Sequence, residues 1–206
     1  MSVSILFYIP NLIGYTRIIF MFLAYYYAEK SPYMFFVFYA FSQAFDMLDG
    51  LAARAFNQAT KFGAMLDMVT DRCSTIGLLL VISNRYPKLT LYSHFFIWLD
   101  IFSHWTHMLA QLSSGAASHK IIKSGPKLLS FYYSAKWFMV LLIIGAEGFP
   151  CCLYLLSYNT IHPMIKKVCT NLNYGLFPLF LTKHFINLIQ FGCAAISLDH
   201  NEKKAQ

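Results

Sequence analysis

Four aspartates that lie close together are the residues of this chain best suited to chemistry. Asp46 and Asp49 have an i, i+3 spacing, and Asp67 and Asp71 have an i, i+4 spacing. The whole chain contains only nine acidic residues, so this stretch is unusually rich in them. Ionisable side chains within apolar segments are costly, which favours a function in binding ions or a charged substrate.

Helical spacing places these acids on two faces that also carry small, hydroxyl and basic residues. A face about 140° wide on one expected helix carries the first two acids with their neighbours Gly50, Ala53 and Arg54. A face about 80° wide on the following helix carries Thr60, Gly63, Asp67 and Asp71. Helices joined by a short connection are usually antiparallel neighbours, so we expect the two faces to meet.

Four facing carboxylates repel one another unless cations lie among them. Ligand sets made only of oxygen select hard ions such as magnesium or manganese, which proteins commonly share with substrate phosphates. Gly50, Ala53 and Gly63 would let a diphosphate approach the backbone, and Arg54 offers a planar fork to phosphate oxygens. The alternative is that the acids mark a helix end, the small residues pack helices and Arg54 anchors the chain at a membrane interface.

The composition indicates that the elements holding these residues are membrane helices. The 206 residues are 58% hydrophobic and only 12% charged, which is too little polar surface for a water-soluble globule. The net charge of +7 is scattered rather than gathered in a basic stripe, so nucleic acid is not the expected partner. We predict an all-α polytopic membrane protein with one domain over residues 1–206 and six transmembrane helices, near 8–28, 33–54, 62–84, 90–112, 128–157 and 174–197.

The flanking charges predict an orientation. Basic residues are slightly more numerous on the face that would hold both termini and the connection between the second and third spans, which places that face in the cytosol. The first residues lack a basic region and a small-residue cleavage site, so we expect the first span to act as its own insertion signal.

The spacing of the aspartates and their neighbours resembles the signature of the CDP-alcohol phosphotransferase family. The matching positions, 46–71, read Asp46-x-x-Asp49-Gly50-x-x-Ala53-Arg54 and then Gly63-x-x-x-Asp67-x-x-x-Asp71. The segment from Pro10 and Asn11 to Arg17 also resembles the family. The run from Phe62 to Thr75, with Ser103-His104-Trp105 and Ser118-His119-Lys120, is most similar to its inositol-using eukaryotic branch.

This resemblance implies a fold, a reaction and roles for individual residues. It implies a six-helix homodimer in the endoplasmic reticulum membrane whose cavity opens to the cytosol, and transfer of a phosphatidyl group from CDP-diacylglycerol to myo-inositol with release of CMP. Two divalent ions, magnesium or manganese, would bind Asp46, Asp49, Asp67 and Asp71, and Asp71 would also be the general base. The CDP moiety would contact Gly50, Ala53, Arg54 and Gly63, with Thr60 and Asn11 as further polar contacts.

Several alternatives remain open from the residues. The acceptor could be serine, glycerol phosphate or an aminoalcohol, and aspartate-rich membrane helices also occur in prenyltransferases and cation-coupled transporters. Asp100, His104 and His107 share one helical face that could bind zinc, form a hydrogen-bonded network or line a polyol cavity. Ser118, His119 and Lys120 could lie near the acceptor or form a basic loop that faces lipid headgroups.

Overall fold

The computed structural model describes residues 4–113 and 126–205, and this part of the chain contains helices and no strands. Two short 3-10 turns, η1 and η2, cover Ile5–Phe7 and Pro87–Leu89. The α-helices are α1 (Ile9–Tyr27), α2 (Pro32–Ala55), α3 (Lys61–Arg85), α4 (Thr90–Ser113), α6 (Lys127–Ser134), α7 (Lys136–Leu156) and α8 (Pro163–Ala205). The expected all-α class is therefore confirmed.

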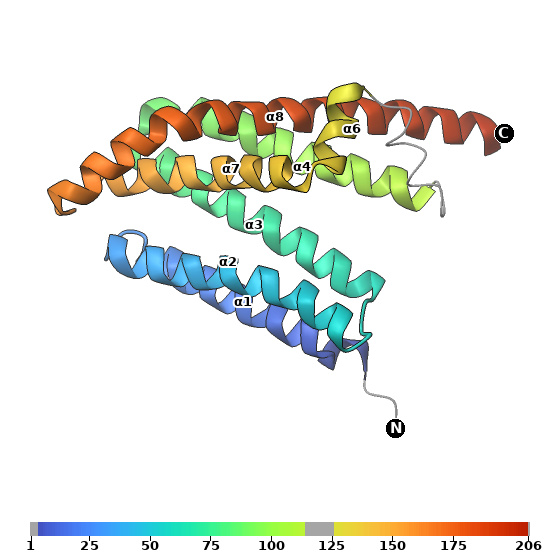
Figure 1. The fold of residues 1–206 in the computed structure, drawn as a ribbon, viewed down its shortest axis with the longest axis horizontal. Helices are drawn as coiled ribbons and strands as arrows, with labels where there is room; N and C mark the ends of the chain where they lie inside the picture. Colours follow the sequence, from blue (N-terminus) through green and yellow to red (C-terminus); the bar gives the residue numbers. More distant parts are fainter. Residues whose placement is uncertain (1–3, 114–125, 206) are drawn as a thin grey trace.

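The helices form two groups with α3 between them (Figure 1). In this view α1 and α2 lie below, α4, α7 and α8 lie above, and α3 runs obliquely from one group to the other. Helix α1 packs closely against both α2 and α3, whereas α2 and α3 make few close backbone contacts with each other. The faces that carry the aspartates therefore meet through side chains, across a space bordered by α1.

Local capping fixes the ends of the helices that position the aspartates. The Ser31 side chain accepts a hydrogen bond from the Met34 N–H, and Pro32 occupies the first helical position, where a missing N–H is tolerated. Thr60 caps α3 in the same way, accepting from the Gly63 N–H at 3.0 Å. Asn57 lies just beyond α2 with a φ of 52°, a left-handed conformation that asparagine tolerates at a helix end. These residues make the tight connection between the two acidic helices.

The last two predicted spans were wrong in their boundaries. The span at 128–157 is two helices, because the chain turns at Ala135 and α6 folds back onto α7 and α8. This turn buries Leu129 and Tyr132 beside Leu142 and Ile186. The span at 174–197 is the middle of α8, which begins at Pro163 and continues to Ala205. Its polar ends lower the hydropathy, but they do not interrupt helical hydrogen bonding.

Two of these helices, α7 and α8 up to Asn201, are long and apolar enough to cross a membrane. Helices α1 to α4 have 19 to 25 residues, which is long enough to span, but their polar and charged side chains reduce their hydropathy. Many large apolar side chains point outward, among them Phe22, Leu91 and Trp137. Such an apolar exterior is typical of a surface that meets lipid or another apolar partner.

Candidate active site

The four aspartates converge on the guanidinium of Arg17, which reaches them from α1. Its Nη1 lies 3.0 Å from Asp49 Oδ2 and 2.9 Å from Asp67 Oδ1. Its Nη2 lies 2.6 Å from both Asp46 Oδ1 and Asp71 Oδ1. One side chain from α1 therefore joins both acidic helices, and it contacts a single oxygen of each carboxylate.

The cluster is closed on one side and open on the other. The Arg17 side chain is only 1% exposed, whereas those of Asp46, Asp67 and Asp71 are 35%, 48% and 33% exposed. Asp49 is more enclosed, at 11%. A ligand can therefore approach the carboxylates from the side opposite Arg17.

The electrostatic balance and the donor atoms fit divalent cations. Arg17 faces four carboxylates, so these five side chains, when ionised, have a surplus of three negative charges. Oxygen atoms of Asp46, Asp49 and Asp67 lie within 4.8 Å of one another. Opposite ligands of an octahedral magnesium ion are about 4.2 Å apart, so a small movement would bring these oxygens to ligand distance.

Arg17 was not predicted to take part in this cluster, beyond its place in the family resemblance. The available signal was a single cationic side chain in the middle of an apolar segment, which marks a function or a buried partner. Helical periodicity could not show that α1 directs this side chain between α2 and α3, because that depends on how three helices pack.

A cavity of about 170 Å³ lies beside the acidic cluster, at the ends of α2 and α3 that their connection joins. Asp49 and Asp67 contribute to its wall. Four predicted donor-binding residues also line it: Gly50, Ala53, Thr60 and Gly63. The structure thus brings these residues together around one space.

Neither Asn11 nor Arg54 is part of the lining of this cavity, although Asn11 lies next to Gly63, which is. A Cβ added to Gly63 would be 3.0 Å from Asn11 Oδ1 and 3.2 Å from Thr60 Oγ1. Asn11 Nδ2 donates to the Ile5 carbonyl at 2.7 Å, while Oδ1 is buried and has no hydrogen-bond partner among the described residues. Arg54 is exposed, with its guanidinium beside Gly50.

Residues 7–156 match the sequence profile of CDP-alcohol phosphatidyltransferases. The chain belongs to this family. It is similar to CDP-diacylglycerol–inositol 3-phosphatidyltransferases from Rattus norvegicus and Homo sapiens, with 40% identity over 201 residues in each case, or 93% of this chain and 91% of theirs. The protein of the same name from Saccharomyces cerevisiae is 37% identical over 201 residues, 97% of this chain and 90% of its own. No solved structure matches the chain.

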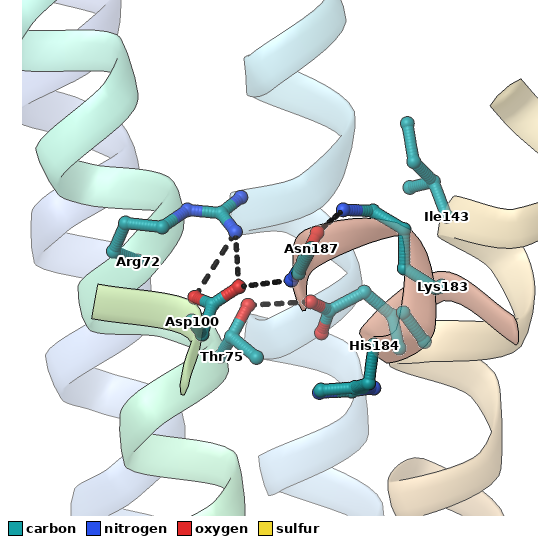
Figure 2. A pocket seen from close by; sticks show the side chains of 9 residues that line it. Arg72, Thr75, Asp100, Ile143, Lys183, His184 and Asn187 are labelled. Carbon is teal, nitrogen blue, oxygen red and sulfur yellow. Dashed lines mark hydrogen bonds and ion pairs between the residues drawn. The ribbon is translucent and has the colours of Figure 1, made fainter. Parts of the chain in front are cut away.

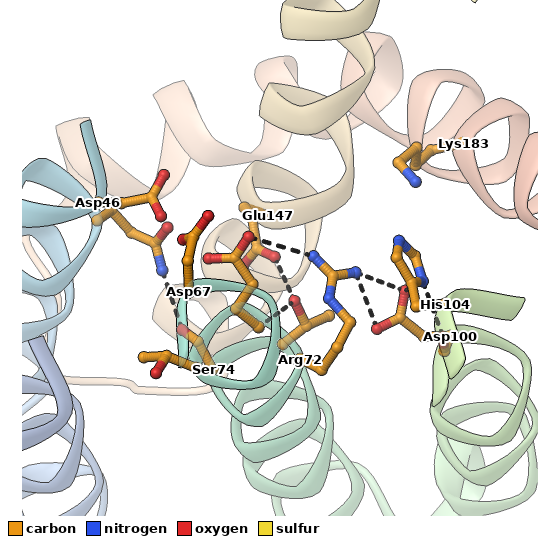
Figure 3. Close-up of polar contacts among 12 residues, drawn as sticks. Asp46, Asp67, Arg72, Ser74, Asp100, His104, Glu147 and Lys183 are labelled. Atoms are coloured by element: carbon orange, nitrogen blue, oxygen red, sulfur yellow. Dashed lines mark hydrogen bonds and ion pairs between the residues drawn. The ribbon is translucent and has the colours of Figure 1, made fainter. Parts of the chain in front are cut away.

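In this phosphatidyltransferase, a second polar network continues from the aspartate cluster (Figure 3). Arg72 follows Asp71 in α3, and its Nη2 lies 3.7 Å from Asp71 Oδ2. Its Nη1 donates to both carboxylate oxygens of Asp100 in α4, at 2.8 and 3.0 Å. Asp100 also accepts from Asn187 Nδ2 in α8 at 3.1 Å. The network thus links the last signature aspartate to α8, which lies beyond the stretch that the family profile matches.

Asp100 and His104 form a hydrogen-bonded network, one of the three interpretations left open for this face. His104 Nδ1 lies 2.8 Å from the Asp100 carbonyl oxygen and 3.5 Å from its carboxylate. His107 turns elsewhere, with its Nε2 2.8 Å from Gln111 Nε2. Among the described residues, one group of histidine, cysteine or acidic side chains is arranged so that it could hold a metal ion, and its members are Asp46, Asp49 and Asp67. Ser118, His119 and Lys120 lie outside the described residues.

Glu147 in α7 is a buried acid that the sequence argument missed. Its carboxylate accepts hydrogen bonds from Thr75 Oγ1 at 2.6 Å and from the Tyr39 hydroxyl. Because Glu147 is a single polar residue in an apolar run, its spacing gives no motif, and only the packing of α2, α3 and α7 reveals its partners.

Proposed function

We propose that this protein transfers the phosphatidyl group of CDP-diacylglycerol to a hydroxyl group of myo-inositol, releasing CMP. The convergence of all four signature aspartates on one side of Arg17, beside a cavity lined by the signature glycines, carries this proposal. The inositol acceptor is supported by relatives that align over nearly the whole chain and are named for that reaction.

The CDP moiety would occupy the cavity between α2 and α3. Gly50, Ala53 and Gly63 leave the space that its phosphates and ribose need near the backbone. Asn11 Oδ1 would accept a hydrogen bond from the nucleotide, since it is buried and has no other partner in the described part of the chain. Thr60 and Arg54 would provide further polar contacts at the rim.

Asp46, Asp49, Asp67 and Asp71 would hold two divalent ions, magnesium or manganese. Such ions, when bound, neutralise a diphosphate and stabilise the negative charge on the leaving phosphate. The negative surplus of the cluster and its all-oxygen donor set support this assignment. Arg17 would hold one oxygen of each carboxylate in place.

Asp71 would accept the proton of the attacking hydroxyl. The inositol oxygen would form a bond to the phosphorus that bears the diacylglycerol, and the bond from this phosphorus to the CMP oxygen would break. Arg17 contacts Asp71 Oδ1 and Arg72 lies near Oδ2, so the carboxylate would keep a fixed orientation toward the acceptor.

The proposed setting is the endoplasmic reticulum membrane, with a single domain of six membrane-spanning helices that forms a homodimer. Six helices of at least 19 residues support the span count. The start of α1, the connection between α2 and α3, and the end of α8 lie at the same end of the bundle in Figure 1, as an even number of spans requires. This end would face the cytosol, where the nucleotide is released.

The direct test is CMP release by the purified protein in lipid. CDP-diacylglycerol and magnesium or manganese are supplied, and inositol, serine, glycerol phosphate and an aminoalcohol are added one at a time. We expect CMP release that depends on both inositol and the divalent ion. Release driven by another alcohol would refute the acceptor assignment, and ion flux without CMP release would point to a transporter instead.

A further inference from the structure

A small polar pocket lies between α3, α4, α7 and α8 (Figure 2). In Figure 3 Arg72 lies between Asp67 of the aspartate cluster and Asp100 of the pocket wall. Its wall includes Arg72, Asp100, Glu147, Lys183 and Asn187. The cavity has a volume of about 40 Å³. A water molecule needs at least roughly 10–15 Å³ by this measure, so the pocket has room for a hydroxyl-sized group.

The charges around this pocket balance one another. Two basic side chains, Arg72 and Lys183, line it together with two acidic ones, Asp100 and Glu147. The aspartate cluster, by contrast, keeps a surplus of negative charge. A balanced set of donors and acceptors suits a neutral polyhydroxyl compound, whereas an anion such as glycerol phosphate would need a cationic surplus.

Several donors in the pocket are left for a ligand. Lys183 is only 8% exposed and forms no ion pair among the described residues. Its ammonium donates to Asn187 Oδ1, which leaves two of its three N–H groups without a hydrogen-bond partner in the described part of the chain. Arg72 Nε is likewise buried and unpartnered there. Buried donors of this kind are costly unless another molecule satisfies them.

The pocket adjoins the site of the reaction. Arg72 lines it and also lies 3.7 Å from Asp71 Oδ2. Thr75, one turn after Asp71, lines the pocket and donates to Glu147. A polyol with one edge in the pocket would therefore have its remaining hydroxyl groups close to the proposed base.

Helix α8 gives this pocket residues that lie outside the stretch matched by the family profile. The profile covers residues 7–156, whereas Lys183, His184 and Asn187 come from α8. The rat and Saccharomyces cerevisiae relatives named for inositol align over 93% and 97% of the chain, and these alignments extend into α8. Residues that select the acceptor are expected in such a segment, because the donor site lies within the profile.

We propose that this pocket binds an edge of the neutral polyol acceptor and that Asn187, His184 and Lys183 of α8 determine acceptor specificity. This inference rests on the proposed function. The hydroxyl groups accept hydrogen bonds from the Lys183 ammonium and donate to Asp100 and Glu147. Asn187 holds the Lys183 ammonium and the Asp100 carboxylate in place, and His184 forms part of the wall.

The test compares two substitutions in the pocket with one outside it. Asn187→Leu removes the amide that donates to Asp100. His184→Phe removes the imidazole nitrogens, of which Nδ1 lies within hydrogen-bond distance of the Phe180 carbonyl. Thr182→Val is the matched control, because Thr182 is on the same helix, bonds to the Pro178 carbonyl and does not line the pocket. KM is measured separately for inositol and for CDP-diacylglycerol.

We expect the pocket variants to raise the KM for inositol about tenfold, with the KM for CDP-diacylglycerol within about twofold of wild type. Thr182→Val should change neither. An unchanged KM for inositol in both pocket variants, or an equal loss of affinity for CDP-diacylglycerol, would overturn the proposal. Failure of the unsubstituted protein to use inositol would instead refute the proposed function, so the two failures are distinguishable.

Discussion

The Arg17 guanidinium in α1 lies 2.6 Å from Oδ1 of Asp71 in α3. The nitrogen that makes this contact, Nη2, also lies 2.6 Å from Oδ1 of Asp46 in α2. One cation therefore links the proposed base to the opposite acidic helix. Helices α2 and α3 make few close backbone contacts with each other, and Arg17 therefore supplies much of the attraction between their acidic faces. It acts as a positioning residue for the carboxylates.

Replacing Arg17 with Gln should destabilise the protein and increase its dependence on divalent ions. Four carboxylates would then share a partly enclosed site without a cation, and breaking a buried charge cluster in this way typically costs about 3–5 kcal/mol. We expect a lower melting temperature in chelator and a larger gain on adding manganese than in wild type, measured by thermal unfolding in detergent.

Arg17→Lys is the matched control for that experiment. Lysine keeps the charge but concentrates it on one nitrogen, which cannot reproduce the two-armed contact with four carboxylates. Its melting temperature should lie between those of wild type and Arg17→Gln. If both variants melt like wild type, Arg17 does not hold the cluster together.

Asp71→Asn should separate catalysis from donor binding. The amide keeps the shape of the side chain but cannot accept the hydroxyl proton, so turnover should fall by about 100- to 10,000-fold. The affinity for CDP-diacylglycerol should change much less. Asp46→Ala is the contrasting variant, because it should impair the metal response and donor binding together. Full turnover in Asp71→Asn would remove this residue from the mechanism.

The acidic half of the site could be predicted from the sequence because its information is local. The i, i+3 and i, i+4 spacings determine which side chains share a helical face, and the turn residues from Glu29 to Pro32 and from Asn57 to Lys61 mark the helix ends. The first four predicted helices accordingly end within a residue or so of α1 to α4. Their membrane-spanning role stays a prediction.

The remainder depends on packing between helices that are distant in the sequence. Arg17 and Glu147 are isolated charged residues in apolar runs, with no spacing that pairs them with their partners, and the spacing of Lys183 and Asn187 does not show that Asn187 reaches Asp100 in α4. The turn at Ala135 was missed because no glycine or proline marks it and because its driving force is burial of α6 side chains against α8. Hydropathy likewise could not locate the polar ends of α8.

Gly63→Ala should weaken binding of the donor more than it weakens the fold. The new Cβ would lie 3.0 Å from Asn11 Oδ1, and Asn11 cannot move easily because it is buried and bonded to the Ile5 carbonyl. Alanine favours the helix over glycine by roughly 0.5–1 kcal/mol, so stability should not fall for intrinsic reasons. We expect a KM for CDP-diacylglycerol several-fold above wild type.

The control for Gly63 is Gly175→Ala in α8, where an added Cβ meets nothing within 4 Å. It should leave the KM for the donor unchanged. A normal KM in Gly63→Ala would mean that the nucleotide does not use the space between α2 and α3.

Gly145→Ala should loosen the contact between α7 and α8. Its Cβ would lie 2.3 Å from Leu179 Cβ and 3.1 Å from the Leu179 carbonyl carbon, so the two helices would have to move apart. Forced overpacking of this kind costs about 1–3 kcal/mol, and we expect a clearly lower melting temperature in detergent. Gly148→Ala on the same helix is the matched control, because its Cβ would meet only the flexible end of Leu176, at 3.3 Å.

The same substitution also tests whether α8 must sit close to α7 for the polar network to form. Leu179 lies one turn before Lys183 and two turns before Asn187, which donates to Asp100. Displacing this part of α8 should therefore lengthen the link to Arg72 and lower turnover at saturating CDP-diacylglycerol, whereas Gly148→Ala should retain it. A Gly145→Ala protein that melts at a lower temperature but keeps full turnover would show that catalysis tolerates movement of α8.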